Sequence, residues 1–145
     1  MIRTLLTGPC LAVALVGCSS PMNGSTAAPT VHDNDHLPSG DATRGRAIAD
    51  QNSCTECHGS DYSGSAFYPN ITQDSQTGIG AWSDPEIAAA LRDGLFIDGT
   101  SLCSLMERFP FSDQQTADVI AYLHSLPSVA KPSGGTCPGH GTKAM

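Results

Sequence analysis

The sequence predicts an all-α fold with three main short helices. Two segments carry capping boxes, in which a Ser and a Glu or Gln three residues later satisfy each other's backbone N–H groups: SDPE at 83–86 and SDQQ at 112–115. No stretch of the chain alternates apolar and polar residues over enough positions to indicate a strand. A length of 145 residues allows one domain with appendages.

The first predicted helix runs from Asp41, a candidate N-cap, to about Asn52. Gly45 interrupts it, and a Gly inside a helix costs about 1 kcal/mol relative to Ala. We therefore expect Gly45 to permit close packing against another element. Residues 59–82 are rich in Gly, Ser, Tyr, Pro and Asn, and this composition predicts a loop.

The second predicted helix begins after Ser83, with Pro85 in its first turn, and ends at Gly94. The third begins at Ser112 and ends before Pro127. Three short helices in about 85 residues bury only a small core, and such domains often depend on a staple or a bound group for stability.

The first 17 residues have the features of a signal peptide. Arg3 supplies a positive charge, and residues 5–16 are mostly apolar but too few to span a membrane. The segment LVGC at 15–18 resembles the cleavage box of bacterial lipoproteins, which implies cleavage before Cys18 and lipid attachment to its thiol. An ordinary signal peptide with Cys18 merely nearby is the alternative. The resemblance implies a lipid-anchored periplasmic protein of a Gram-negative-type bacterium, with Ser19 slightly favouring the outer membrane.

Residues 18–39 carry the predicted lipidated Cys and then a polar stretch without apolar period, which predicts a flexible tether before a domain at 40–128. The formal net charge of the chain is −7. An acidic protein is a poor partner for nucleic acid, because phosphates require a basic face. The acidity favours docking against a basic patch on a partner protein, or serves only solubility.

The segment CTECH at 54–58 is the C-x-x-C-H signature of covalent c-type haem attachment. Cys54 and Cys57 can lie on one side of a helical turn and bond the two vinyl groups of one porphyrin, while His58 follows as an iron ligand. A redox dithiol or half of a zinc site are the alternatives. A single haem c would also supply the apolar centre that the small core lacks.

The remaining cysteines can be assigned by elimination. Cys10 leaves with the signal peptide and Cys18 takes lipid, so Cys103 and Cys137 remain. Two leftover thiols in an oxidising compartment are expected to pair. This disulfide would staple the C-terminal tail, residues 129–145, to the loop after the second helix. Two buried or separately reactive thiols are the alternative.

A six-coordinate iron needs a second axial ligand, and Met106 is the best candidate. It lies in an irregular stretch between the second and third helices, from which a loop can fold over the open haem face. A thioether suits iron that changes charge, and His/Met ligation raises the reduction potential. Ordinary core filling is the alternative for Met106. Other candidate ligands are Met22, Met145, His124 and His140.

This order of helices and ligands resembles the class I cytochromes c, over residues 40–128. The segments YPNIT at 68–72 and TGIGAWSD at 77–84 resemble haem modules of the cytochrome subunits of membrane alcohol and sugar-acid dehydrogenases. The resemblance implies that the Pro69 carbonyl accepts the His58 N–H and that Trp82 lies beside the haem edge. It also implies that Tyr122 packs where the last helix crosses the first at Gly45.

Met106 also falls where this family has its axial Met, but Glu107 follows it where the family usually has Pro. The loop is therefore expected to be less rigid, or the ligand less firmly held. Dehydrogenase subunits of this kind commonly carry several haem modules, whereas this chain has one C-x-x-C-H segment. On this basis we do not expect the chain to be such a whole subunit.

These observations predict a lipid-anchored monohaem cytochrome that carries single electrons between redox partners, without substrate turnover of its own. The partners would be a dehydrogenase, a reductase or an oxidase. One alternative is a dedicated electron-transfer subunit of a dehydrogenase or reductase complex. Two others are a haem sensor or peroxidase-like protein with a labile sixth ligand, and a lipoprotein that keeps haem only for folding.

Overall fold

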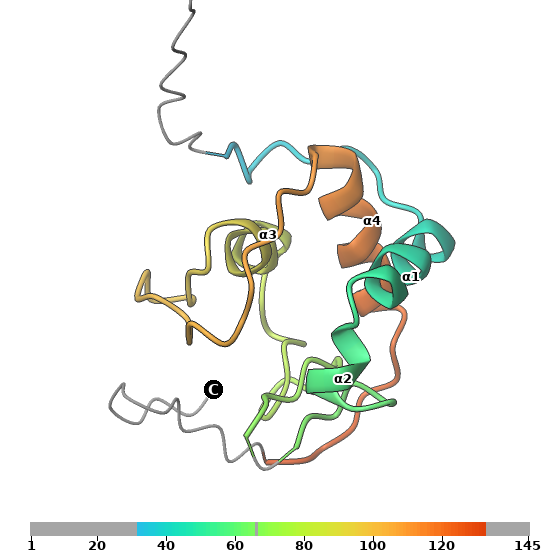
Figure 1. Cartoon of the computed structure of the whole chain (residues 1–145), viewed down its shortest axis with the longest axis vertical. Helices are drawn as coiled ribbons and strands as arrows, with labels where there is room; N and C mark the ends of the chain where they lie inside the picture. The colour runs from blue at the N-terminus through green and yellow to red at the C-terminus, as the bar shows by residue number, and fades with distance from the viewer. Residues whose placement is uncertain (1–31, 66, 133–145) are drawn as a thin grey trace, which may run out of the picture. The chain divides into compact units, whose positions relative to one another are not determined.

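The computed structural model describes residues 32–65 and 67–132. These ranges contain no β-strand, only one isolated antiparallel bridge between Leu95 and Ser101, so the all-α prediction is confirmed. The three expected main helices are present, and the CTECH segment forms a fourth, shorter one (Figure 1). The helices are α1 Ala42–Gln51, α2 Cys54–His58, α3 Asp84–Arg92 and α4 Asp113–His124.

Helices α3 and α4 begin at the two capping boxes. The Glu86 carboxylate accepts the Ser83 backbone N–H at 2.7 Å. At the start of α4, the Ser112 N–H donates to Gln115 Oε1 at 3.0 Å, and the Gln115 N–H donates to Ser112 Oγ at 3.3 Å. Each cap satisfies backbone donors that the first helical turn leaves without a partner, and local sequence alone therefore sets both helix starts.

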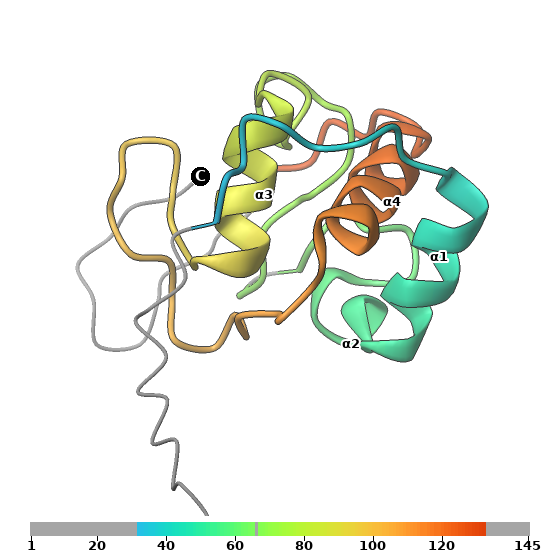
Figure 2. The ribbon, with the colours of Figure 1, turned by 90° about the horizontal axis from the view of Figure 1, so that it is seen from above.

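Helices α1 and α4 lie side by side and form the main helix pair of the fold (Figures 1 and 2). At their crossing, a Cβ built on Gly45 would stand 1.8 Å from the Asp118 carbonyl oxygen and 2.8 Å from the Tyr122 Cβ. Only a residue without a side chain allows this approach. The expectation that Gly45 permits close packing, with Tyr122 at the crossing, is confirmed.

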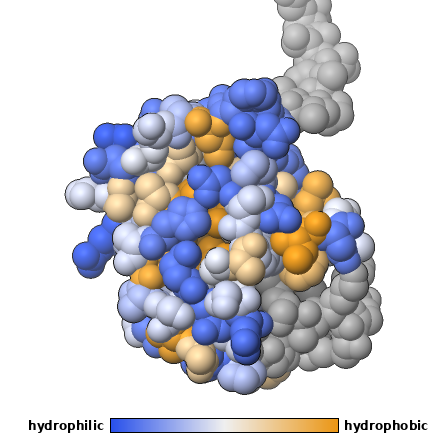
Figure 3. All heavy atoms as spheres, turned by 180° about the vertical axis from the view of Figure 1, so that it is seen from behind, coloured by the Kyte–Doolittle hydropathy of each residue, from blue (hydrophilic) through white to orange (hydrophobic). Residues whose placement is uncertain are grey.

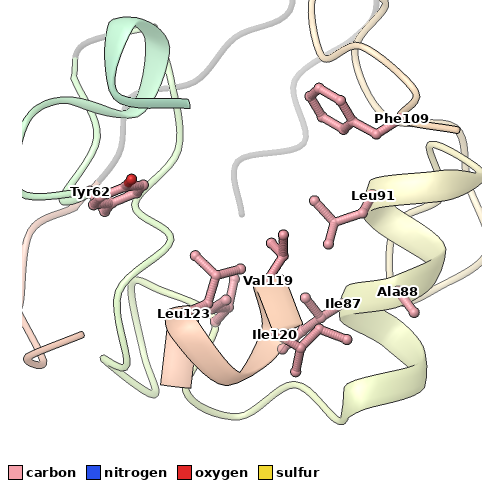
Figure 4. Packing of buried hydrophobic residues seen from close by; sticks show 9 residues of the cluster. Tyr62, Ile87, Ala88, Leu91, Phe109, Val119, Ile120 and Leu123 are labelled. Carbon is pink, nitrogen blue, oxygen red and sulfur yellow. The ribbon is translucent and has the colours of Figure 1, made fainter. Parts of the chain in front are cut away.

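The hydrophobic core lies between α3, α4 and the loops that flank them. In Figure 4, Ile87 and Leu91 of α3 point towards Val119 and Ile120 of α4, and Tyr62 and Phe109 lie on opposite sides of this group. Cys54, Trp82 and Met106 are partly buried against this cluster. The buried members of the core cluster are Tyr62, Ile79, Ile87, Ala88, Leu91, Phe109, Val119, Ile120 and Leu123.

Residues 32–40, which we call the N-terminal strap, run past α3 and α4 to the start of α1 (Figure 2). His32 Nδ1 lies 2.8 Å from Asp93 Oδ1, and Asn34 donates to Asp93 Oδ2 at 2.9 Å. Arg92 Nε donates to Asn34 Oδ1 at 3.1 Å. The last part of the predicted tether is therefore held against the domain, because its polar side chains find partners at the end of α3.

The face shown in Figure 3 is largely hydrophilic, with hydrophobic residues visible in small groups among polar ones. Within the described ranges, no helix combines the length and the apolar character needed to cross a bilayer. The predicted signal peptide and lipidation site at Cys18 fall in residues 1–31, and Cys137 falls in residues 133–145, so both lie outside the described residues.

Candidate functional site

The CTECH segment is itself a helix, α2, connected to α1 by a two-residue turn. Ser53 has a φ of 55°, a left-handed conformation that redirects the chain between the two helices. Among the described residues, Cys54 and Cys57 are the free cysteines, and both are half-buried. Burial raises the pKa of the Cys54 thiol. The spacing of three residues within one helix brings both thiols to the same side, as two bonds to one group require.

His58 ends α2 and is buried, with 5% of its surface exposed. Its Nδ1 lies 2.9 Å from the Pro69 carbonyl oxygen. A carbonyl can only accept, so Nδ1 carries the hydrogen and Nε2 keeps its lone pair. Burial lowers the pKa of His58, which favours the neutral imidazole. A neutral imidazole with an oriented ring and a bare Nε2 is a ready metal ligand.

Gly64 brings the Pro69 peptide to His58, a role that sequence reasoning missed. The Gly64 N–H donates to the His58 carbonyl at 2.8 Å. Gly64 has a φ of +78°, and a Cβ there would stand 2.5 Å from the Tyr68 carbonyl oxygen. The same Cβ would stand 2.7 Å from the Asn70 nitrogen. Both the backbone conformation and the space therefore require glycine, and the only signal in the sequence was the Gly-rich composition of the loop.

Met106 and Trp82 lie in other parts of the chain, on either side of α3 in sequence. Met106 is half-buried against the core cluster, and its N–H donates to the Cys103 carbonyl at 2.9 Å. Trp82 makes an edge-to-face contact with Phe96, with ring centroids 5.3 Å apart. Among the described residues, no hydrogen bond or ring contact joins either side chain to His58, and their roles beside the iron remain predictions.

The donor set of this site fits haem c. Two free thiols and an imidazole with a lone pair on Nε2, all on one short helix, would provide two covalent attachment points and one axial ligand. Within residues 32–65 and 67–132, no group of three or more His, Cys, Asp or Glu side chains is placed to hold a metal ion by itself. When bound, the haem supplies iron that changes between Fe(II) and Fe(III) by one electron. Cys54 and Cys57 would hold this group, and the Pro69 carbonyl would orient His58 towards it.

Comparisons with known proteins show the family of this chain. The family model described as Cytochrome c matches residues 42–127. The fructose dehydrogenase cytochrome subunit of Gluconobacter japonicus is 32% identical over 124 residues, which cover 70% of this chain and 25% of that protein. The chain therefore spans about a quarter of the length of this relative. Fold, motif and family match lead to one conclusion: the chain belongs to the cytochrome c family, whose members transfer electrons through a covalently attached haem c.

Proposed function

We propose that this protein is a monohaem electron carrier of the periplasm, held to a membrane by lipid on Cys18, that accepts electrons from a dehydrogenase. The observation that carries the proposal is the α2 site, where a buried His58 with a bare Nε2 follows two free thiols. This arrangement serves a permanently attached one-electron group. The chain's own residues hold and orient that group, and the proposal assigns them no substrate turnover.

The proposed partner rests on the relative from Gluconobacter japonicus, which is named as the cytochrome subunit of a fructose dehydrogenase. The test is affinity purification of the full-length, haem-loaded protein from detergent-solubilised membranes of its host. Co-purification of a dehydrogenase that reduces the haem when given its substrate supports the proposal. Co-purification of an oxidase or reductase alone, with no dehydrogenase able to reduce the haem, contradicts the proposed donor.

The proposed anchor rests on the lipoprotein-like box that ends at Cys18. In a host that processes lipoproteins, the parent protein is expected in the membrane fraction and the C18S variant in the soluble periplasmic fraction. Separation of inner from outer membranes then locates the anchor. Recovery of the parent protein as a soluble periplasmic protein, identical to C18S, would exclude lipidation at this residue.

The proposed sixth ligand is Met106, supported by its half-buried position against the core cluster. The exposed Glu107 beside it, where the family usually has Pro, favours a second candidate function, an open-site sensor or peroxidase-like protein. The rate of carbon monoxide binding to the ferrous protein distinguishes a Met106-ligated electron carrier from an open-site sensor or peroxidase-like protein. We expect slow or absent binding in the parent protein and fast binding in Met106→Ala.

Leu105→Ala is the matched control, because the neighbouring residue Leu105 is 54% exposed. This variant should bind carbon monoxide as the parent does. Rapid binding by the parent protein, together with oxidation of a peroxidase dye by hydrogen peroxide, would favour the second candidate instead.

A further inference from the structure

Residues 128–131, which we call the C-terminal strap, lie along the loop that carries Pro69. The Val129 N–H donates to Thr72 Oγ1 at 3.2 Å, and the Lys131 N–H donates to Thr77 Oγ1 at 3.1 Å. These bonds join segments separated by more than fifty positions. The strap follows α4 and forms no helix, so its placement depends on these loop contacts.

Asn70 is the centre of this contact and is fully buried, with 0% of its surface exposed. Its Nδ2 donates to the Val129 carbonyl at 2.7 Å and to Thr77 Oγ1 at 3.1 Å. Its Oδ1 accepts the Thr72 N–H at 2.9 Å and the Thr72 hydroxyl at 2.7 Å. Every polar atom of the amide therefore has a partner, and a fully satisfied buried network of this kind resists movement.

This network is attached to the haem ligand from two sides. Asn70 directly follows Pro69, whose carbonyl oxygen accepts the His58 Nδ1–H. On the other side, Lys131 Nζ donates to the Gly64 carbonyl at 2.7 Å, and the Gly64 N–H donates to the His58 carbonyl. The C-terminal strap thus bonds Asn70, which follows the Pro69 carbonyl that accepts from His58. It also bonds Gly64, which packs against the Pro69 peptide.

We propose that Asn70, held by Thr72 and the C-terminal strap, is a positioning residue that fixes the Pro69 carbonyl on His58 and thereby sets the reduction potential. A well-aligned Nδ1–H···O bond makes the imidazole a stronger electron donor, which stabilises Fe(III) relative to Fe(II). If the Asn70 amide loses its partners, the Pro69 carbonyl can move. This movement weakens the hydrogen bond from His58 Nδ1 and raises the reduction potential. The inference concerns the haem site alone and is independent of the partner, the anchor and the compartment.

The experiment compares Thr72→Val with Thr116→Val in the full-length, haem-loaded protein. Both threonines are fully buried, and both changes replace one hydroxyl by a methyl group of similar size. Thr72→Val removes the hydroxyl that bonds Asn70 and Val129, whereas the Thr116 hydroxyl of α4 donates to the carbonyl of Ser112, the N-cap of the same helix. The readouts are the midpoint reduction potential, the solvent exchange of the His58 Nδ1 proton in the reduced protein, and the unfolding midpoint.

We expect both variants to lose stability, but only Thr72→Val to show a raised potential and faster exchange of the Nδ1 proton. A change of up to about tenfold in the relative stability of the two oxidation states corresponds to about 59 mV for one electron. Equal potentials and equal exchange rates in the two variants would show that the network is only structural and would overturn the proposal.

Thr77→Val is the second variant, for the case in which Thr72→Val yields no haem-loaded protein. Thr77 is half-buried, and its Oγ1 accepts from both the Asn70 side chain and the Lys131 backbone. As for Thr72→Val, we expect a raised reduction potential and faster exchange of the His58 Nδ1 proton. An unchanged potential and exchange rate in Thr77→Val, with the strap bonds lost, would equally overturn the proposal.

Discussion

Gly45 faces the main chain of Asp118 so closely that a Cβ on the glycine would stand 1.8 Å from the Asp118 carbonyl oxygen. The Asp118 carboxylate holds the same crossing through side chains, since Arg44 donates to it from Nε and from Nη2, each at 2.8 Å. It also accepts the Asp41 backbone N–H at 2.8 Å. One residue of α4 thus bonds the cap and the first turn of α1, beside the position where the two backbones come closest.

Gly45→Ala is expected to destabilise the protein by about 1–3 kcal/mol, because the added methyl group forces α1 and α4 apart. Helix propensity alone predicts the opposite sign, a gain of about 1 kcal/mol. Denaturant unfolding of the haem-loaded protein measures the difference. Arg46→Ala, on the exposed side of α1, is the control and should change stability by less than about 0.5 kcal/mol. A Gly45→Ala variant more stable than the parent would contradict the close crossing.

Asp118 should make stability depend on pH in the acid range. The hydrogen bonds from Arg44 hold the pKa of the buried Asp118 carboxyl at about 2, below its ordinary value of 3.8. A carboxyl with a depressed pKa in the folded state stabilises the protein above the unfolded pKa. This contribution should therefore be complete above about pH 4 and be lost as the pH falls towards 2.

Asp118→Asn tests this dependence, because it keeps the shape of the side chain and removes the charge. We expect a loss of about 2 kcal/mol at neutral pH, the scale of hydrogen bonds to a charged group. Unfolding free energies of parent and variant should converge as the pH is lowered from 5 to about 2.5. A constant difference across that range would exclude Asp118 as a source of acid sensitivity.

The N-terminal strap should depend on Asn34. The buried side chain of Arg92, 1% exposed, donates to Asn34 Oδ1 from Nε and Nη2 and to Asp113 Oδ1 from Nη1. Asn34→Ala leaves two of these donors without their acceptor, at a cost of about 1–3 kcal/mol. Limited proteolysis should cut residues 32–40 faster in this variant. Asp35→Ala, an exposed neighbour, is the control, and equal cutting of both variants would contradict a bonded strap.

Gly64 and Gly99 form a matched pair for testing the loop at 59–82 that carries Pro69, the hydrogen-bond acceptor of His58. Both have a positive φ, +78° and +77°, but a Cβ on Gly99 would meet nothing within 4 Å. Ala at either position bears a backbone strain of about 1–2 kcal/mol. Ala at Gly64 must also displace the peptide of Pro69, so the yield of haem-loaded protein should fall and its potential should change. A Gly64→Ala protein that matches Gly99→Ala in yield and potential would contradict this role.

Local features of the chain were predicted from sequence because they depend on neighbouring residues. The starts of α3 and α4 follow from side chains that bond backbone groups three positions away. Likewise, the CTECH segment places two thiols and an imidazole on one helix, so the cofactor follows from five consecutive residues. The hydrogen bond from His58 to Pro69, implied by family resemblance, is present across eleven positions.

Residues 32–39 are the described part of the segment 18–39 that the sequence predicts as a flexible tether, and they bond distant residues of the domain. The composition of this segment is that of a solvated linker, yet Asn34 bonds residues 58 and 59 positions away. Composition describes what a segment can do alone and carries no information on distant partners. The lipid on Cys18, the Cys103–Cys137 disulfide and Met106 ligation remain predictions.

By itself, then, the sequence determined the all-α class, the helix starts and the attached cofactor, since each depends on contacts along a single turn. Only the tertiary structure decided which residues fix the Pro69 carbonyl that accepts the hydrogen bond from His58. The Asn70 amide reaches Val129 across 59 positions. The free energy of such a bond includes closing a long loop, so its partner is chosen by how α1, α3 and α4 pack and not by any local pattern.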